Sequence, residues 1–132
     1  MKSTRFAGLE FSVPILLAPM AGSVGPDLVA AVSNAGGLGV LPLWHLNASE
    51  TKANVAATRA LTSKPFGINF NNNYPMDEHL IAAIAENIAI ASFFWGIDAD
   101  RIRRAKDAGM TVFQTIGTAT EARQAVDREW TS

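Results

Sequence analysis

Five short stretches of the chain bring together small, amide, hydroxyl and aromatic side chains, and each one follows an apolar run. They are Ala18-Pro19-Met20-Ala21-Gly22, Leu43-Trp44-His45, residues 69–73, Phe93-Phe94-Trp95-Gly96 and Gln114-Thr115-Ile116-Gly117-Thr118. His45 is their only ionisable residue. A hydrolase needs a nucleophile with a base beside it, or paired carboxylates, and these stretches offer neither. They fit the binding of a flat, neutral, hydrogen-bonding ring whose own atoms perform the reaction.

The five stretches meet in space if the apolar runs before them are parallel strands. Such runs occupy residues 14–19, 38–43, 66–70, 88–94 and 110–116, and segments of helical period separate them. This alternation is typical of a βαβ chain. The carboxyl ends of parallel strands share one edge of a sheet, where α/β proteins bind their ligands. We therefore expect one α/β domain over residues 1–132, with its functional residues at that edge.

Residue types at the helix ends predict where each helix begins. The expected starts are Pro26, Ser49, Asp77, Asp98 or Asp100, and Thr118 or Thr120. Gly36-Gly37-Leu38-Gly39 follows a helix and precedes a strand, so it indicates helix termination rather than phosphate binding. In the helix that starts at Asp77, we expect Leu80, Ile81 and Ile84 to face the core and His79 to face solvent.

Composition excludes several classes of partner. Eleven basic and twelve acidic residues give a net charge of −1, which offers no attraction to nucleic acid or to a membrane surface. The chain has no cysteine, so disulfides, thiolate nucleophiles and cysteine-ligated metals are excluded, and we expect no metal site and a cytoplasmic protein. Glu10 and Glu86 interrupt the two apolar stretches that could otherwise resemble a signal peptide or a membrane span.

Five motifs in a fixed order resemble the nitronate monooxygenase family, formerly called 2-nitropropane dioxygenases. The motifs lie at residues 14–22, 31–39, 64–69, 91–96 and 114–122, and they read PILLAPMAG, AVSNAGGLG, KPFGIN, ASFFWG and QTIGTATEA. The resemblance implies an FMN-dependent enzyme that oxidises alkyl nitronates or nitroalkanes with dioxygen. It also implies that the chain supplies about the first five strands of a TIM-type (β/α)₈ barrel and is truncated before the later strands, which carry the phosphate site.

The resemblance assigns roles to individual residues. The backbone of Ala18, Pro19, Met20 and Ala21 would lie along the flavin, with Met20 near the ring. Asn69 would bind FMN through its amide, which both donates and accepts hydrogen bonds. Gln114 and Thr115 would supply a further flavin contact, and the register of their strand decides which of the two points into the barrel.

The catalytic residue stays unassigned. Phe94 stands where nitronate oxidisers of this family commonly carry a histidine, and phenylalanine cannot accept a proton. A nitronate is already anionic and needs no base, whereas a neutral nitroalkane does. His45 is a weak candidate, because no orienting partner is visible in the sequence.

Other interpretations stay open at this point. One is a non-catalytic half-barrel that associates with itself or with another chain through exposed sheet edges. A second is a flavin-dependent enzyme like the enoyl-acyl-carrier-protein reductases, which are close relatives of the family. A third is a complete, open, five-stranded flavodoxin-like domain, which a chain of 132 residues is long enough to form, whereas a whole barrel needs about 250 residues.

Overall fold

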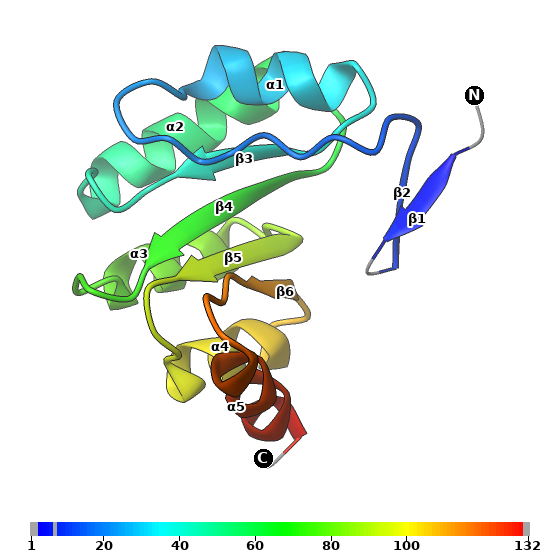
Figure 1. The fold of residues 1–132 in the computed structure, drawn as a ribbon. Coiled ribbons are helices and arrows are strands. Elements are labelled where there is room, and N and C mark those ends of the chain that lie inside the picture. Colours follow the sequence, from blue (N-terminus) through cyan, green and yellow to red (C-terminus); the bar gives the residue numbers. More distant parts are fainter. Residues whose placement is uncertain (1–2, 7, 131–132) are drawn as a thin grey trace.

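A computed structural model describes residues 3–6 and 8–130 as a curved parallel sheet with a small hairpin at one end (Figure 1). The hairpin pairs β1 (Thr4–Phe6) with β2 (Leu9–Phe11) in antiparallel fashion. The main sheet has the order β3-β4-β5-β6, all parallel. Its strands are β3 (Gly39–Pro42), β4 (Phe66–Asn71), β5 (Ile90–Phe94) and β6 (Thr111–Gln114). The predicted α/β class with parallel strands is confirmed.

In the described residues, five helices connect or follow these strands. They are α1 (Pro26–Asn34), α2 (Ala48–Leu61), α3 (Asp77–Ala85), α4 (Ala99–Asp107) and α5 (Ala119–Trp130). Asp98 and Thr118 cap α4 and α5 as predicted, because their side-chain oxygens accept hydrogen bonds from backbone N–H groups of the first turn. The prediction of Ser49 as the N-cap of α2 is wrong. The N-cap is Asn47, two residues before Ser49, and it forms a capping box with Glu50. None of the helices in the described residues could span a membrane.

One face of the sheet carries the main core. Phe66, Ile68 and Phe70 of β4 point to this face and pack with buried residues of the first four helices, among them Val29, Val55, Leu80 and Ile102. Gly39 allows α1 to approach β3 closely, and the Ser33 hydroxyl accepts a hydrogen bond from the Gly39 N–H at 3.1 Å. This close packing holds β3 against α1 and fixes which side of the strand faces the helices.

The opposite face, which we call the inner face, is covered at its amino end by the hairpin. Phe11 belongs to a second apolar cluster with Leu38, Val40 and Ile90. Phe6 packs on Phe113 with ring centroids 5.3 Å apart. In Figure 1 the hairpin lies on the right, at the end where β4 begins, and the loops that follow β4 and β5 lie on the left. The hairpin therefore covers only the amino end of the inner face.

The expected strand at residues 14–19 is not a strand of the sheet. It makes a single parallel bridge, Leu16 with Leu38, through the Leu17 N–H to the Leu38 carbonyl and the Leu38 N–H to the Ile15 carbonyl, both at 2.9 Å. Pro19 has no N–H to donate to β3, so the ladder cannot extend toward the carboxyl end, and at the other end the Ile15 N–H bonds the Val13 carbonyl at 2.8 Å instead of the neighbouring segment. The segment nevertheless lies beside β3, where the first barrel strand was predicted.

The predicted burial of α3 is partly wrong. Ile81 is 58% exposed, whereas His79 is buried and its Nε2 bonds the carbonyl of Leu46, in the loop after β3. Leu80 is buried as expected, together with the small residues Ala82 and Ala83. Because alanines allow a closer approach to the sheet, the helix turns this side inward and leaves Ile81 outside.

The glycine cluster after α1 is structural, as predicted. Gly36 has φ +94°, a left-handed conformation that ends the helix at low steric cost. A Cβ atom on Gly39 would lie 2.2 Å from the carbonyl oxygen of Val29. The backbone of α1 thus occupies the space that a side chain on β3 would need.

Gly39→Ala should therefore destabilise the fold. Overpacking against backbone costs typically about 1–3 kcal/mol, and we expect a loss within that range, measured as a lower midpoint of urea denaturation with an unchanged slope. Gly25→Ala is the control, because a Cβ there meets nothing within 4 Å. Equal midpoints for the two variants would show that α1 can move away from β3.

Candidate functional site

The register of the sheet aligns a row of side chains across the inner face. Pro42, Asn69, Ser92 and Phe113 are register partners on the four successive strands. The next row toward the carboxyl ends pairs Asn71 with Phe94. Amide, hydroxyl and aromatic groups thus replace the apolar residues that fill the row nearer the hairpin.

Asn69 is the polar centre of this row. It is 1% exposed, and its Nδ2 lies 3.2 Å from both the carbonyl oxygen and the hydroxyl of Ser92. A carbonyl only accepts hydrogen bonds, so the NH₂ side of the amide must face Ser92. The Oδ1 atom is buried and has no hydrogen-bond partner among the described residues. A buried orphan acceptor is costly, and a ligand with an N–H or O–H group would satisfy it.

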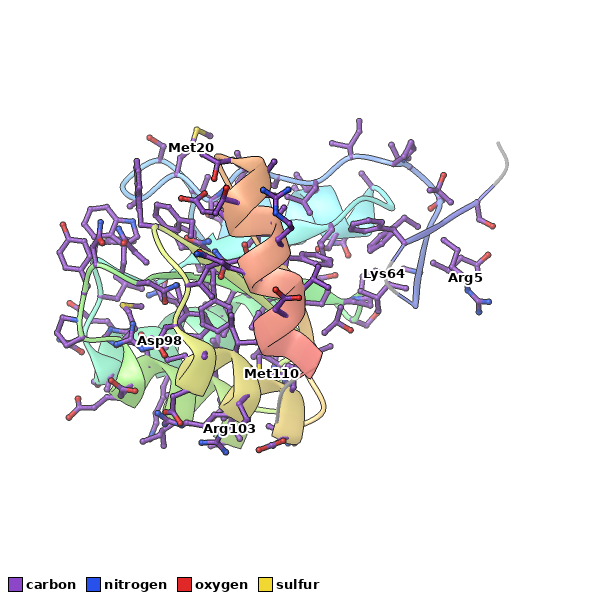
Figure 2. All side chains as sticks on the ribbon, turned by 60° about the horizontal axis from the view of Figure 1, so that its bottom comes forward. Arg5, Met20, Lys64, Asp98, Arg103 and Met110 are labelled. Atoms are coloured by element: carbon purple, nitrogen blue, oxygen red, sulfur yellow. The ribbon has the colours of Figure 1, made fainter. Side chains whose placement is uncertain are left out.

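The segment Ala18-Pro19-Met20-Ala21 lies at the same edge of the sheet, on the left of Figure 1. The Met20 carbonyl accepts hydrogen bonds from the N–H groups of Ser23 and Val24, which turns the chain toward α1. The Met20 side chain is 51% exposed, and Figure 2 shows it far from Arg5 of the hairpin. Exposed backbone and small side chains at this turn would let a flat ring approach closely.

The side chains around Gln114 and Thr115 show which of these two residues points to the inner face. Gln114 is in step with Val112, which packs on the helix side, and both line a small cavity of about 120 Å³ against α4 and α5. Thr115 is in step with Phe113, and its N–H bonds the Phe93 carbonyl at 2.9 Å. Thr115 therefore lies on the inner side with Phe113, and Gln114 lies on the helix side with Val112.

Gln114 instead holds the turn after β5, a feature that the sequence analysis missed. Its Nε2 donates to the Gly96 carbonyl at 3.1 Å, and the Nδ2 of Asn72 donates to the same oxygen at 3.1 Å. Trp95, just before, has φ +61°, a left-handed conformation that is rare for a bulky residue. Two amides from the neighbouring strand ends thus hold a strained turn in place.

A buried arginine extends this arrangement to two helices. The Arg101 side chain is 9% exposed; it reaches Asn72 Oδ1 at 3.5 Å and forms ion pairs with Asp77 at 3.2 Å and Asp98 at 3.5 Å. Its hydrogen bond is the main reason why the pKa of Asp77 lies below the ordinary value of 3.8, and Arg104 lowers that pKa further. The starts of α3 and α4 are therefore tied together behind the loop that carries Asn72.

A cavity of about 300 Å³ opens beside the strained turn. Phe94, Trp95, Thr115 and Ile116 line it, and Glu121 is the only ionisable residue among its lining residues. The Glu121 carboxylate accepts a hydrogen bond from the Gly117 N–H at 2.6 Å. The cavity thus adds one carboxylate to the site. Phe94 lies at the inner face, where the resemblance places a histidine.

His45 lies at the rim of the site rather than within it. The residue is exposed, and its ring meets the edge of Trp44 with centroids 5.8 Å apart. Trp44 in turn stacks on Tyr74, with centroids 5.2 Å apart. These contacts are aromatic and supply no hydrogen bond that would orient the imidazole as a base.

Comparison with known proteins relates the chain to one family. Residues 3–89 match the family model described as nitronate monooxygenase. The chain is 55% identical over 61 residues to the nitronate monooxygenase of Paraburkholderia phytofirmans, an alignment covering 46% of this chain and 17% of that protein. It is 35% identical over 122 residues to a (3aS,4S,5R,7aS)-5-hydroxy-7a-methyl-1-oxo-octahydro-1H-indene-4-carboxyl-CoA dehydrogenase of Rhodococcus jostii, covering 92% of this chain and 34% of that protein.

Solved structures give the same fold. FabK from Thermotoga maritima has a TM-score of 0.85 at 30% identity, over 89% of this chain and 38% of that one. Nitroalkane oxidase from Streptomyces ansochromogenes has a TM-score of 0.82 at 29% identity, over 89% of this chain and 44% of that one. These neighbours are TIM barrels, and the parallel strands described above correspond to part of them. The chain spans about a third of the length of the curated relatives that match most of it.

The ion pairs of Asp77 predict a pH dependence of folding. Because its pKa is lowered in the folded chain, ionised Asp77 stabilises the fold above its ordinary pKa of 3.8, and this contribution is lost as the pH falls through the lower, folded value. The side chain is 54% exposed, so Asp77→Asn should lower the free energy of unfolding at neutral pH by about 0.5 kcal/mol, as for other exposed pairs.

Urea denaturation across this pH range measures the effect. The difference between Asp77→Asn and the unaltered chain should shrink below the ordinary Asp value of 3.8. Asp107→Asn is the control, since Asp107 pairs only with the half-exposed Arg103 in the ion pairs described. A difference for Asp77→Asn that stays constant down to acidic pH would contradict the assigned pKa direction.

Proposed function

Since the chain belongs to the nitronate monooxygenase family, we propose that it carries the ring-binding part of an FMN-dependent oxidoreductase that oxidises alkyl nitronates with dioxygen. The observation that carries the proposal is the buried, unpartnered Oδ1 of Asn69 on the inner face. FMN, when bound, would accept two electrons from the nitronate and pass them to dioxygen. The protein itself would bind the flavin and the substrate, orient them toward each other and exclude water from the site.

The residues at the carboxyl edge fit this task. Asn69 would accept a hydrogen bond from an N–H of the flavin ring, and Ser92 would keep its amide in the required orientation. The exposed turn at Ala18, Pro19, Met20 and Ala21 would lie along the ring. Thr115, just after β6, would lie on the inner side of the sheet. Phe94 leaves no base at the usual position, which agrees with a substrate that arrives as an anion and needs no deprotonation.

A second function is favoured by the extent of one alignment. The dehydrogenase from Rhodococcus jostii, named for a bicyclic acyl-CoA, matches 92% of the chain, against 46% for the nitronate monooxygenase from Paraburkholderia phytofirmans. This supports, as the alternative, a dehydrogenase acting on a ring-bearing acyl thioester. The likeness to FabK likewise supports a reductase of the enoyl-acyl-carrier-protein type.

A non-catalytic role through sheet edges is the further alternative. β6 pairs only with β5 within the described sheet, and Ile15 and Leu16 of the segment beside β3 are 62% and 48% exposed. Unpaired apolar edges recruit other strands. A second copy of the chain, or another chain with complementary strands, would then cover both edges.

Flavin content and oxygen uptake test the proposal. The purified chain should be yellow, release FMN in a ratio near one per chain, and consume oxygen when ethyl nitronate is added. Oxidation of an acyl-CoA without nitronate-dependent oxygen uptake would favour the dehydrogenase. A colourless dimer in light scattering would instead favour the half-barrel.

A substitution at Asn69 tests the ring contact itself. Asn69→Leu is similar in volume and removes the orphan acceptor, so we expect stability to change by less than about 1 kcal/mol while FMN affinity falls about tenfold or more. Isothermal titration with FMN and urea denaturation measure the two effects. Asn47→Ala is the control: losing a helix cap costs about 1 kcal/mol and should leave FMN affinity intact. Unchanged FMN affinity in Asn69→Leu would exclude Asn69 from the site.

A further inference from the structure

We propose that Trp95 determines substrate specificity by presenting its indole to an uncharged ring or flat apolar group of the substrate. The contact would lie in the cavity of about 300 Å³ between the turn after β5 and the start of α5. This inference rests on the proposed function, because it names the class of substrate that the same site would take.

The backbone of Trp95 is the first argument. Its φ of +61° lies in the left-handed region, where a residue with a Cβ atom pays about 1–2 kcal/mol and where glycine fits without cost. A bulky residue persists there only when its surroundings hold it, and such positions concentrate at ligand sites. A turn needed only to connect β5 with α4 would carry glycine here, as it does at the next position, Gly96, with φ +75°.

The restraints on this turn are the second argument. The Gly96 carbonyl accepts hydrogen bonds from Asn72, after β4, and from Gln114, on β6. The Asn72 N–H also bonds the Phe94 carbonyl at 3.0 Å. Arg101 fixes Asn72 from behind. The backbone on both sides of Trp95 is therefore held by hydrogen bonds from both neighbouring strand ends, so this backbone loses little freedom when the indole binds a ligand.

The exposure of the indole is the third argument. Trp95 is 61% exposed, although tryptophan is a residue that folding usually buries to a large extent. Its side chain lines the cavity beside Phe94, with ring centroids 6.0 Å apart. Two aromatic rings set at 47° to each other form a corner that fits the edge and the face of a flat group.

The charges of the lining residues determine which substrate groups can bind between the rings of Phe94 and Trp95. Phe94, Trp95 and Ile116 are apolar, and the only ionisable lining residue is Glu121, whose carboxylate disfavours an anion close by. The anionic part of any substrate must therefore lie away from this carboxylate. The part that meets Trp95 is uncharged, and a flat ring gains most from two aromatic walls.

Binding of a neutral bicyclic probe tests the inference without turnover or flavin. We expect 1-indanone to bind the chain saturably in ligand-detected NMR, and acetone and propionate to bind at least about tenfold more weakly. Trp95→Gly should weaken 1-indanone binding by about tenfold or more, whereas Trp95→Phe should keep most of it. Trp44→Phe is the control, because Trp44 stacks on Tyr74 in another loop and should leave the probe's affinity unchanged.

Thermal unfolding separates recognition from packing. Glycine suits the left-handed backbone, so Trp95→Gly should keep or raise the melting temperature while binding is lost. If Trp95→Gly lowers the melting temperature and 1-indanone still binds with the original affinity, Trp95 is a packing residue and the inference is overturned.

Kinetic measurements connect this inference with the proposed function and show which of the two fails if only one is wrong. With active chain, Trp95→Gly should lower the ratio of kcat/KM for the nitronate of phenylnitromethane to that for ethyl nitronate by about tenfold or more. An unchanged ratio would overturn the inference although nitronate oxidation stands. A chain without flavin that binds 1-indanone through Trp95 would refute the proposed function and leave the recognition of a ring intact.

Discussion

The alternation of side chains along β4 is the constraint on which the rest of the structure depends. Phe66, Ile68 and Phe70 face the helices, so Gly67, Asn69 and Asn71 must face the other side. The parallel register repeats this division on the neighbouring strands and brings Asn69 between Pro42 and Ser92. A shift of the strand by one residue would turn Asn69 toward the helices and Phe70 toward the inner face. Core packing and ligand binding are thus two consequences of one register.

The polar groups at the carboxyl edge differ in what they hold. Asn72, Gln114 and Arg101 direct hydrogen bonds at other protein groups, and together they hold the turn at Trp95. Asn69 and Gln114 each keep one buried oxygen without a hydrogen-bond partner among the described residues, but that of Asn69 belongs to the inner face, whereas Gln114 lines the cavity against α4 and α5. Similar amide side chains on neighbouring strands therefore serve different purposes.

Much of the architecture follows from sequence periodicity, and the errors have local causes. The parallel strands after residue 38 and the helices between them could be predicted, because apolar runs and caps agree there. Residues 14–19 could not, because Pro19 has no N–H to donate and the Ile15 N–H turns back to the Val13 carbonyl, which limits pairing to one bridge. The burial of His79 depends on a carbonyl 33 residues away, which no local pattern reports. The left-handed conformation of Trp95 likewise depends on amides from two other segments.

The hairpin at the start of the chain links its first residues to its last strand. Phe6 packs on Phe113, so this contact cannot form during synthesis until β6 has left the ribosome. Until then the apolar cluster of Leu38, Val40 and Ile90 lacks part of its cover. Bringing Phe6 and Phe113 together closes a long stretch of chain, which is slow compared with forming each βαβ unit. Until β6 has been made, the growing chain therefore leaves the apolar residues of this cluster partly uncovered, and they are open to non-native contacts during that time.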